Sequence, residues 1–216
     1  MVPRLSALVL CLPVFWASAA AADLRVTAGE ETFEALAAKS PIPLRVAVAS
    51  GEASAKLVAL GSGIRTKLAF KVYEGVLYVD ETAELPPIPF PAIIQGTFAK
   101  RSVMIFLRDV DSAKIKDAWE DGFKTAFREK PPTVDLEKAR DAFLAYFEGQ
   151  NVALGQTIEF TWLPGVGLCT SIAGTSFPPI DHPGLASALW SIWLGEKPIS
   201  ESLKQDLVRL WRASKP

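Results

Sequence analysis

The chain has 216 residues, of which 50% are hydrophobic and 22% charged, with a formal net charge of −1 and a single histidine. This length and composition are typical of a globular protein with one hydrophobic core and exclude a disordered or fibrous chain. The near-neutral charge excludes the overall basicity by which many proteins attract nucleic acid or an anionic membrane.

The first 22 residues are typical of a secretory signal peptide. Arg4 precedes an apolar run, and the small residues up to Ala22 provide an Ala-x-Ala cleavage pattern before Asp23. The run is too short to span a bilayer, and no later stretch reaches the length of apolar sequence that a membrane helix needs. We therefore expect export across the inner membrane, to the periplasm in a Gram-negative host. Residues 23–216 are expected to form a single domain without a transmembrane segment.

Cleavage would change the charge and the cysteine count only slightly. Loss of Arg4 reduces the 23 basic side chains to 22, against 24 acidic ones, so the net charge becomes −2. Loss of Cys11 leaves Cys169 as the single cysteine, so no disulfide can form within the chain. The fold must therefore be stabilised by packing.

The first half of the domain is predicted to be β-structure. Alternating apolar residues predict a strand over 44–48, followed by a turn within 50–55. The β-branched and aromatic residues of 57–79 predict one long strand or two paired strands. Residues 84–92 carry four prolines, which exclude a central strand or a helix interior. Residues 102–108 predict a further strand.

The second half shifts to helical spacing. Apolar residues from Ile115 to Phe127 recur on one face and predict a helix that begins near Asp111, and a second helix is expected over 133–147. The remaining predicted elements are strands over 156–163 and 168–173 and helices over 184–194 and 200–211. Together these elements predict an α+β domain in which helices cover a mainly antiparallel sheet.

The Gly61-Ser62-Gly63 sequence matches the start of a dinucleotide-binding motif. That motif needs a third glycine where Thr66 stands, and then a helix, but the next residues alternate as in a strand. Without a helix N-terminus to face a phosphate, no nucleotide site is expected. The two glycines are interpreted as a place where the strand bends.

The chain lacks the residues for a metal centre or an activated nucleophile. After signal cleavage it has one histidine and one cysteine, too few for zinc, haem or copper, so we expect no cofactor. Asp109 and Asp111 are interpreted as a strand end and a helix cap. His182 is expected at the surface, in a proline-bounded turn, and Cys169 in the core.

Arg65 and Tyr73 are candidate ligand-binding residues. A guanidinium binds a carboxylate through two hydrogen bonds, and the Tyr73 hydroxyl could add a donor. On one straight strand the two residues would lie about 26 Å apart, so they can share a ligand only if the chain reverses near Thr66–Leu68. On the residues alone, a surface ion pair for Arg65 and a half-buried strand position for Tyr73 are the favoured interpretation.

The tryptophans of the predicted helices have two interpretations. Trp119, Trp190 and Trp193 occur at helical spacing, which is typical of core packing. The same side chains could line an apolar pocket if the helices do not close completely over the sheet.

Four blocks of sequence resemble the bacterial chalcone isomerase-like family. They are GSGIRTKLAFKVYEGVLYVD, FLRDVDSAKIKDAWEDGF, IEFTWLPGVG and LWSIWLGEKPISESLKQDLV. Their order and spacing extend the resemblance over residues 57–208. The resemblance implies an open-faced β-sandwich, in which a large antiparallel sheet is covered by a layer of helices with a ligand cleft between them.

The resemblance implies one catalytic alternative. Plant enzymes of this fold cyclise chalcones without a cofactor, using an arginine as electrophile, and Arg65 falls on that position. The supporting polar positions fall on Tyr73, near Asp111 and Ala118, and near Ile192, so most of the polar set is replaced. The alternative hypothesis is therefore an isomerase or intramolecular lyase that acts on an unknown substrate through Arg65.

The leading hypothesis follows from non-enzymatic relatives that hold a fatty-acid carboxylate with an arginine and a tyrosine. It describes an exported, non-catalytic binding protein for a fatty acid or similar amphipathic carboxylate. The headgroup would bind Arg65 and Tyr73, and the tail would lie under Trp190, Ile192 and Trp193. A third hypothesis is an envelope protein that binds a partner and whose cleft is vestigial.

Overall fold

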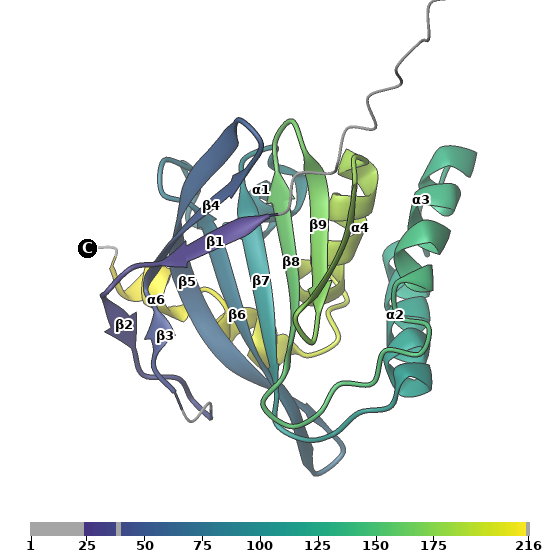
Figure 1. Ribbon diagram of the computed structural model, residues 1–216, viewed down its shortest axis with the longest axis horizontal. Coiled ribbons are helices and arrows are strands. Elements are labelled where there is room, and N and C mark those ends of the chain that lie inside the picture. Colours follow the sequence, from purple (N-terminus) through teal and green to yellow (C-terminus); the bar gives the residue numbers. More distant parts are fainter. Residues whose placement is uncertain (1–23, 38–39, 215–216) are drawn as a thin grey trace, which may run out of the picture.

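The computed structural model describes residues 24–37 and 40–214 (Figure 1). The predicted signal peptide, residues 1–22, lies outside the described residues. Within the described part of the chain, a large antiparallel sheet of eight strands carries helices on one side, and a short two-stranded ribbon lies near its first strands. No helix in this part is long and apolar enough to cross a bilayer.

The strands of the large sheet follow one another across it in the order of the chain. They are β1 (Arg25–Ala28), β4 (Arg45–Ser50), β5 (Ala53–Lys67), β6 (Phe70–Asp80), β7 (Lys100–Phe106), β8 (Thr157–Leu163), β9 (Gly167–Ile172) and β10 (Thr175–Ile180). The ribbon pairs β2 (Thr32–Phe33) with β3 (Ile42–Pro43). Residues 57–79 thus belong to two paired strands, the second of the two predicted arrangements.

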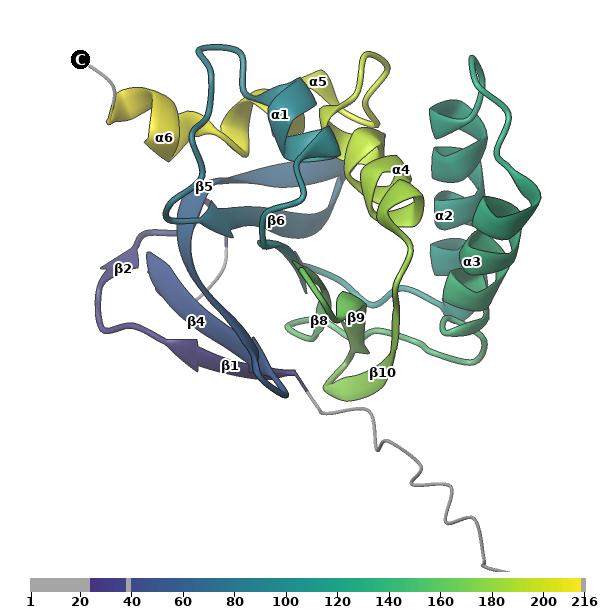
Figure 2. The same cartoon turned by 90° about the horizontal axis from the view of Figure 1, so that it is seen from above.

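The helices gather on one side of the sheet (Figure 2). They are α1 (Phe90–Gln95), α2 (Ser112–Ala126), α3 (Val134–Ala145), α4 (Pro183–Leu194), α5 (Glu201–Asp206) and α6 (Arg209–Ala213). The α4 helix packs between α1 and α2, and its residues are buried on nearly every side. His182 is half-buried and caps this helix, since its Nδ1 accepts the N–H of Leu185 at 3.2 Å. The histidine therefore has a structural role that the predicted surface position did not include.

Three predicted elements differ from the observed ones. The α1 helix begins at Phe90, inside the proline-rich segment, because Pro91 occupies its first turn, where a missing N–H costs no hydrogen bond. The first part of the predicted proline-bounded turn before α4 belongs to the edge strand β10, which ends at Ile180 and in which Pro178 and Pro179 coincide with a shift in register. The predicted last helix is broken into α5 and α6, since Val208 leaves the helical conformation.

Side chains alternate between the two faces of the sheet, as the pleat requires, except where the register shifts in β5 and β10. On the helix-covered face, Leu77, Phe106 and Phe160 join residues of the helices in the larger hydrophobic cluster. On the opposite face, Val48 and Val76 belong to a smaller cluster. We call these the helix face and the inner face.

The sheet curls around its inner face, so that β1 comes round towards β9 and β10 (Figure 2). Leu24 and Val26 at the first strand line the same cavity as Ser176 and Pro178 of the last strand. The inner face is therefore enclosed by the sheet itself, whereas the helix face depends on helices for its cover.

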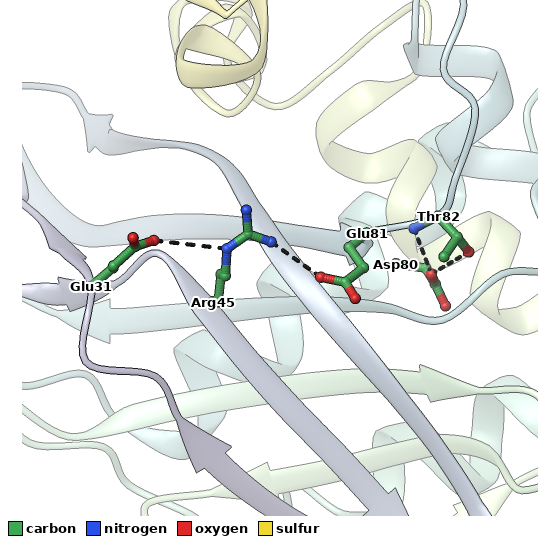
Figure 3. A network of polar contacts seen from close by, with 5 residues as sticks. All are labelled: Glu31, Arg45, Asp80, Glu81 and Thr82. Atoms are coloured by element: carbon green, nitrogen blue, oxygen red, sulfur yellow. Dashed lines mark hydrogen bonds and ion pairs between the residues drawn. The ribbon is translucent and has the colours of Figure 1, made fainter.

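An exposed polar network attaches the N-terminal segment to the sheet (Figure 3). Arg45 of β4 lies 3.1 Å from the Glu81 carboxylate and 3.8 Å from that of Glu31. Beside it, the Asp80 carboxylate accepts the N–H and hydroxyl of Thr82 at 2.9 and 2.6 Å. Because these side chains are solvated, the network is expected to add little stability and mainly to orient the segment.

Candidate functional site

A cavity of about 540 Å³ opens between the helix face of β5–β7 and helices α2 and α4. Its wall is mostly apolar, and its rim carries charged side chains. The apolar wall includes Met104, Phe106, Ile115, Trp119, Ile192 and Trp193. The charged rim includes Arg65, Lys67, Arg108, Asp109 and Lys114.

The glycines of the G-x-G-x-R sequence explain how β5 reaches this cavity. Gly61, Gly63 and Arg65 point to the helix face, and a Cβ added at Gly61 would lie 2.3 Å from the Asp206 carbonyl oxygen. At Gly63 an added Cβ would lie 2.5 Å from the Asp206 Cβ. The glycines therefore allow α5 and its following turn to pack against the strand, a role that the interpretation of a bend did not include. The register of β5 also shifts between Ala59 and Gly61. Arg65 is the next side chain on this face.

Arg65 and Tyr73 are direct partners across the β5–β6 hairpin. The chain reverses at Leu68–Ala69, and both side chains line the cavity. The register shifts by one residue immediately beyond the Arg65–Tyr73 pair. Such bulges redirect side chains and are frequent beside functional sites. The reversal that a shared ligand requires is thus present.

Tyr73 is buried, with its hydroxyl held at the cavity wall. The indole Nε1–H of Trp193 donates to the Tyr73 oxygen at 2.9 Å, and the ring of Phe106 packs 5.9 Å away, centroid to centroid. Burial raises the pKa of Tyr73 to about 12, so the hydroxyl is neutral at physiological pH. Because it accepts from Trp193, its own proton can be donated to another group.

Arg65 is half-buried and has no carboxylate partner among the described residues. One of its Nη1–H groups donates to the neighbouring Thr66 carbonyl oxygen. A guanidinium has five donors, so most of them remain available to a ligand. The surface ion pair that the residues alone favoured for Arg65 is therefore not observed within residues 24–37 and 40–214.

Of the three tail contacts predicted on α4, two line the cavity and the third does not. Ile192 and Trp193 line the cavity. Trp190 does not, in contrast to the expectation, because it points towards the α1 side of α4 and is 0% exposed. There the Nζ of Lys100 lies 5.1 Å from the centroid of its ring and donates to the carbonyl oxygens of Ile93 and Gly96 at the end of α1.

The sequence did not identify several residues of the cavity. Trp119 was open between core and pocket, and it belongs to both: it packs edge-on against Phe160 and Trp193 and also lines the cavity. Arg108 and Lys114, at the rim, carried no signal because isolated basic residues at a strand end or helix start are common. For the part of the wall that α2 forms, the signal in the sequence was the helical spacing of its apolar residues.

Apart from Tyr73, the positions that match the polar set of the plant enzymes are apolar or lie outside the cavity. Ala118 and Ile192 line the cavity but carry no hydrogen-bonding side chain. Asp111 occupies the N-cap position of α2, as expected, and pairs with Lys114, which lowers the pKa of its carboxyl group. It does not line the cavity.

A second cavity, of about 350 Å³, lies on the inner face. Its charged groups pair with each other: Arg101 donates to the Glu159 carboxylate at 2.6 Å and also to the Thr161 hydroxyl at 2.8 Å. Cys169 also lines it, and burial raises the pKa of its thiol to about 11, which makes it unreactive. No group of three or more metal-ligating side chains gathers in the described part of the chain.

Comparisons with known proteins agree with this architecture. A search of curated proteins found no match. Among solved structures, the crystal structure of a fatty-acid binding protein from Arabidopsis thaliana is similar, with a TM-score of 0.60 and 15% identity over 85% of this chain and 96% of that one. At this identity the likeness shows the fold alone, and it confirms the predicted α+β fold of chalcone isomerase type. Residues 42–208 match the family described as chalcone isomerase-like, and the chain therefore belongs to that family.

Proposed function

We propose that the protein is an exported, non-catalytic binding protein for a fatty acid or a similar amphipathic carboxylate. The observation that carries this proposal is the juxtaposition of Arg65 and Tyr73 at the wall of an apolar cavity. The guanidinium has no carboxylate partner among the described residues, and the hydroxyl has a proton to donate. A carboxylate between them would satisfy both groups.

The cavity suits the rest of such a ligand. Its volume of about 540 Å³ lies within the ordinary range for small-molecule sites, and its wall is lined mainly by aliphatic and aromatic side chains. Phe106, Trp119 and Trp193 would contact the acyl chain, while the charged groups would remain near the rim. Burial of the chain would provide most of the affinity, and Arg65 would orient the headgroup.

Two further observations support the proposal without establishing it. The similar Arabidopsis structure is that of a fatty-acid binding protein. The first 22 residues have the pattern of a cleavable export signal, which supports the proposed location outside the cytoplasm.

The test is direct binding of a long-chain fatty acid, such as palmitate, together with native mass spectrometry of protein purified from its own host. We expect an acyl ligand to copurify and Arg65→Ala to weaken palmitate binding at least about tenfold, the usual loss for a charge-assisted hydrogen bond. Tyr73→Phe should weaken it several-fold. Lys71→Ala is the matched control, since it removes a positive charge from the same hairpin at a residue that does not line the cavity. Absence of any acyl ligand, with equal binding by the native protein and Arg65→Ala, would refute the proposal.

The isomerase alternative predicts a different result from the same variants. Incubation with chalcones and related enones should give no turnover above the uncatalysed rate. Turnover that Arg65→Ala abolishes would instead make Arg65 an electrophile and the protein an enzyme.

A further inference from the structure

Two large apolar side chains are exposed at the tip of the β5–β6 hairpin, at the rim of the cavity. Leu68 is 91% exposed and Phe70 is 59% exposed, and both line the cavity opening. Figure 1 shows this hairpin projecting from the lower end of the molecule. A lone exposed leucine is common on proteins. A leucine and a phenylalanine exposed together at the opening of a cavity form an apolar patch of the kind that marks an interaction site.

The conformation of the tip makes the leucine more unusual. Leu68 has a φ of 56°, in the left-handed region where hairpin turns normally carry glycine, asparagine or aspartate. A leucine there is unfavourable in two ways: its side chain strains the left-handed backbone, and its apolar surface is exposed to water. Positions where a residue contradicts the local turn preference are frequently functional.

Basic side chains surround the apolar tip. Arg65, Lys67, Lys71 and Arg108 form no ion pair with any described residue, and the Arg108 guanidinium lies 5.0 Å from the centre of the Phe70 ring. The acids nearby are engaged elsewhere. Asp109 accepts the N–H of Leu154 at 2.7 Å, Asp111 pairs with Lys114, and Asp121 pairs with Lys124.

We propose that this tip docks on the surface of an anionic phospholipid bilayer. Leu68 and Phe70 would enter the boundary between headgroups and acyl chains, and the four cations would contact lipid phosphates. The charge is complementary to such a surface, and each basic residue near it strengthens binding by about fivefold at low salt. A nucleic acid would match the charge but offers no apolar layer for an aliphatic side chain such as Leu68.

Docking in this orientation would place the cavity opening against the membrane. Leu68, Phe70 and Lys67 contribute both to the tip and to the rim, so an amphipathic ligand could pass between bilayer and cavity without crossing bulk water. This consequence rests on the proposed function, whereas the docking itself does not.

The test is cosedimentation of ligand-free protein with vesicles of phosphatidylcholine or of equimolar phosphatidylcholine and phosphatidylglycerol. We expect binding to the anionic vesicles only, and weaker binding as the salt concentration rises. The variant Leu68→Asn with Phe70→Ser should lose at least about tenfold in vesicle affinity. Asparagine tolerates the left-handed conformation, so this variant should fold. Lys67→Gln with Lys71→Gln should lose a similar factor at low salt.

A matched control lies at the far end of α2. This helix begins next to the hairpin, since the Leu107 N–H donates to the Val72 carbonyl at 2.9 Å. It is 15 residues long, about 22 Å, and is followed by Val134, which is 66% exposed at the start of α3. Val134→Asn with Lys138→Gln removes an apolar group and a charge there and should leave vesicle binding unchanged.

Three outcomes would overturn the proposal. They are equal binding to both kinds of vesicle, native-like binding by the Leu68→Asn, Phe70→Ser variant, and binding of a single-stranded oligonucleotide that depends on Lys67 and Lys71 but not on Leu68. None of these involves a fatty acid. A failure of docking is therefore distinguishable from a failure of palmitate binding in solution, which the Arg65→Ala comparison decides separately.

Discussion

The two faces of the sheet each border a cavity, but their polar groups are in opposite states. On the inner face, Arg101 bonds to Glu159 and Thr161, so its guanidinium has a carboxylate partner. On the helix face, among the described residues, Arg65 donates to a neighbouring carbonyl alone and Tyr73 accepts from Trp193 alone. What distinguishes the two cavities as candidate ligand sites is therefore the arginine that lacks a carboxylate partner among the described residues, and not cavity volume.

Strand β6 shows the same contrast with a single residue type. Tyr78 points to the inner face and donates its proton to the Pro43 carbonyl oxygen at 3.0 Å. Tyr73 points to the helix face and receives a hydrogen bond, which leaves its proton available. Burial raises the pKa of both hydroxyl groups. One tyrosine thus ties the N-terminal segment to the sheet, and the other can serve a ligand.

The largest predicted effect tests whether the helix face is more tightly packed than the inner face at neighbouring positions of β5. Gly61→Ala should lower the free energy of unfolding by about 3 kcal/mol, because the new Cβ would overlap the backbone of Asp206 and Arg209. Urea denaturation measures the loss. Ser62→Ala is the control on the opposite face: its buried hydroxyl has no partner among the described residues, so its loss should cost almost nothing. Equal effects of the two variants would contradict the different packing of the faces.

The next effect tests whether the inner cavity is structural. Arg101→Leu should cost about 2 kcal/mol, because it leaves the partly buried Glu159 carboxylate without its partner. Palmitate affinity should not change. The double variant Arg101→Leu, Glu159→Leu should recover part of the stability. A loss of palmitate binding by Arg101→Leu would contradict the proposal that the ligand binds in the helix-face cavity.

A smaller effect concerns the hydrogen bond between the cavity walls. Trp193→Phe should cost about 1.5 kcal/mol, through the lost hydrogen bond to Tyr73 and the missing ring volume. Because that bond lowers the pKa of Tyr73, the variant should titrate this tyrosine at higher pH. Ultraviolet titration measures the shift, and an unchanged profile would show that the bond does not form in solution.

The smallest effect is the pH dependence that Tyr73 contributes. Its folded-state pKa of about 12 lies above the ordinary value of 10.0, so the folded protein keeps a proton that the unfolded chain releases. The stability from this group is complete below pH 10 and is lost as the pH rises towards 12. Over the first half of that range we expect a loss of about 1 kcal/mol. Tyr73→Phe should remove this part of the decline while Tyr78 still contributes, so parallel curves would contradict the assignment.

Much of the fold was predictable because it depends on local periodicity. Alternation predicted β4, β-branched and aromatic content predicted one long strand or two paired strands over residues 57–79, and helical spacing predicted α2, α3 and α4. The proline-rich segments were harder to predict, because Pro91 is compatible with a helix start and Pro178 with an edge strand, and only the neighbours of each segment distinguish these from a loop. The break between α5 and α6 had no clear local signal.

The sequence named candidate residues for the site but not its geometry. Residue chemistry and then a resemblance pointed to Arg65 and Tyr73, the resemblance led to Ile192, and helical spacing singled out Trp193. Trp190 shares that spacing yet faces α1, because a helix buried on nearly every side gives its sequence no single apolar face. The cluster of basic side chains at the hairpin tip could not be predicted from the net charge of −1, because a sum over the chain does not show where cations gather.

The sequence by itself therefore determined the class of fold, the family and the residue types available to the candidate site. Local periodicity and short motifs carry that information, because they act over a few residues. Only the tertiary structure decided which side chains share a face, which polar groups bond to each other, and which remain available. Those outcomes depend on strand register and on contacts between distant segments, so the purpose of Gly61 and Gly63 became visible only where α5 and its turn approach the strand.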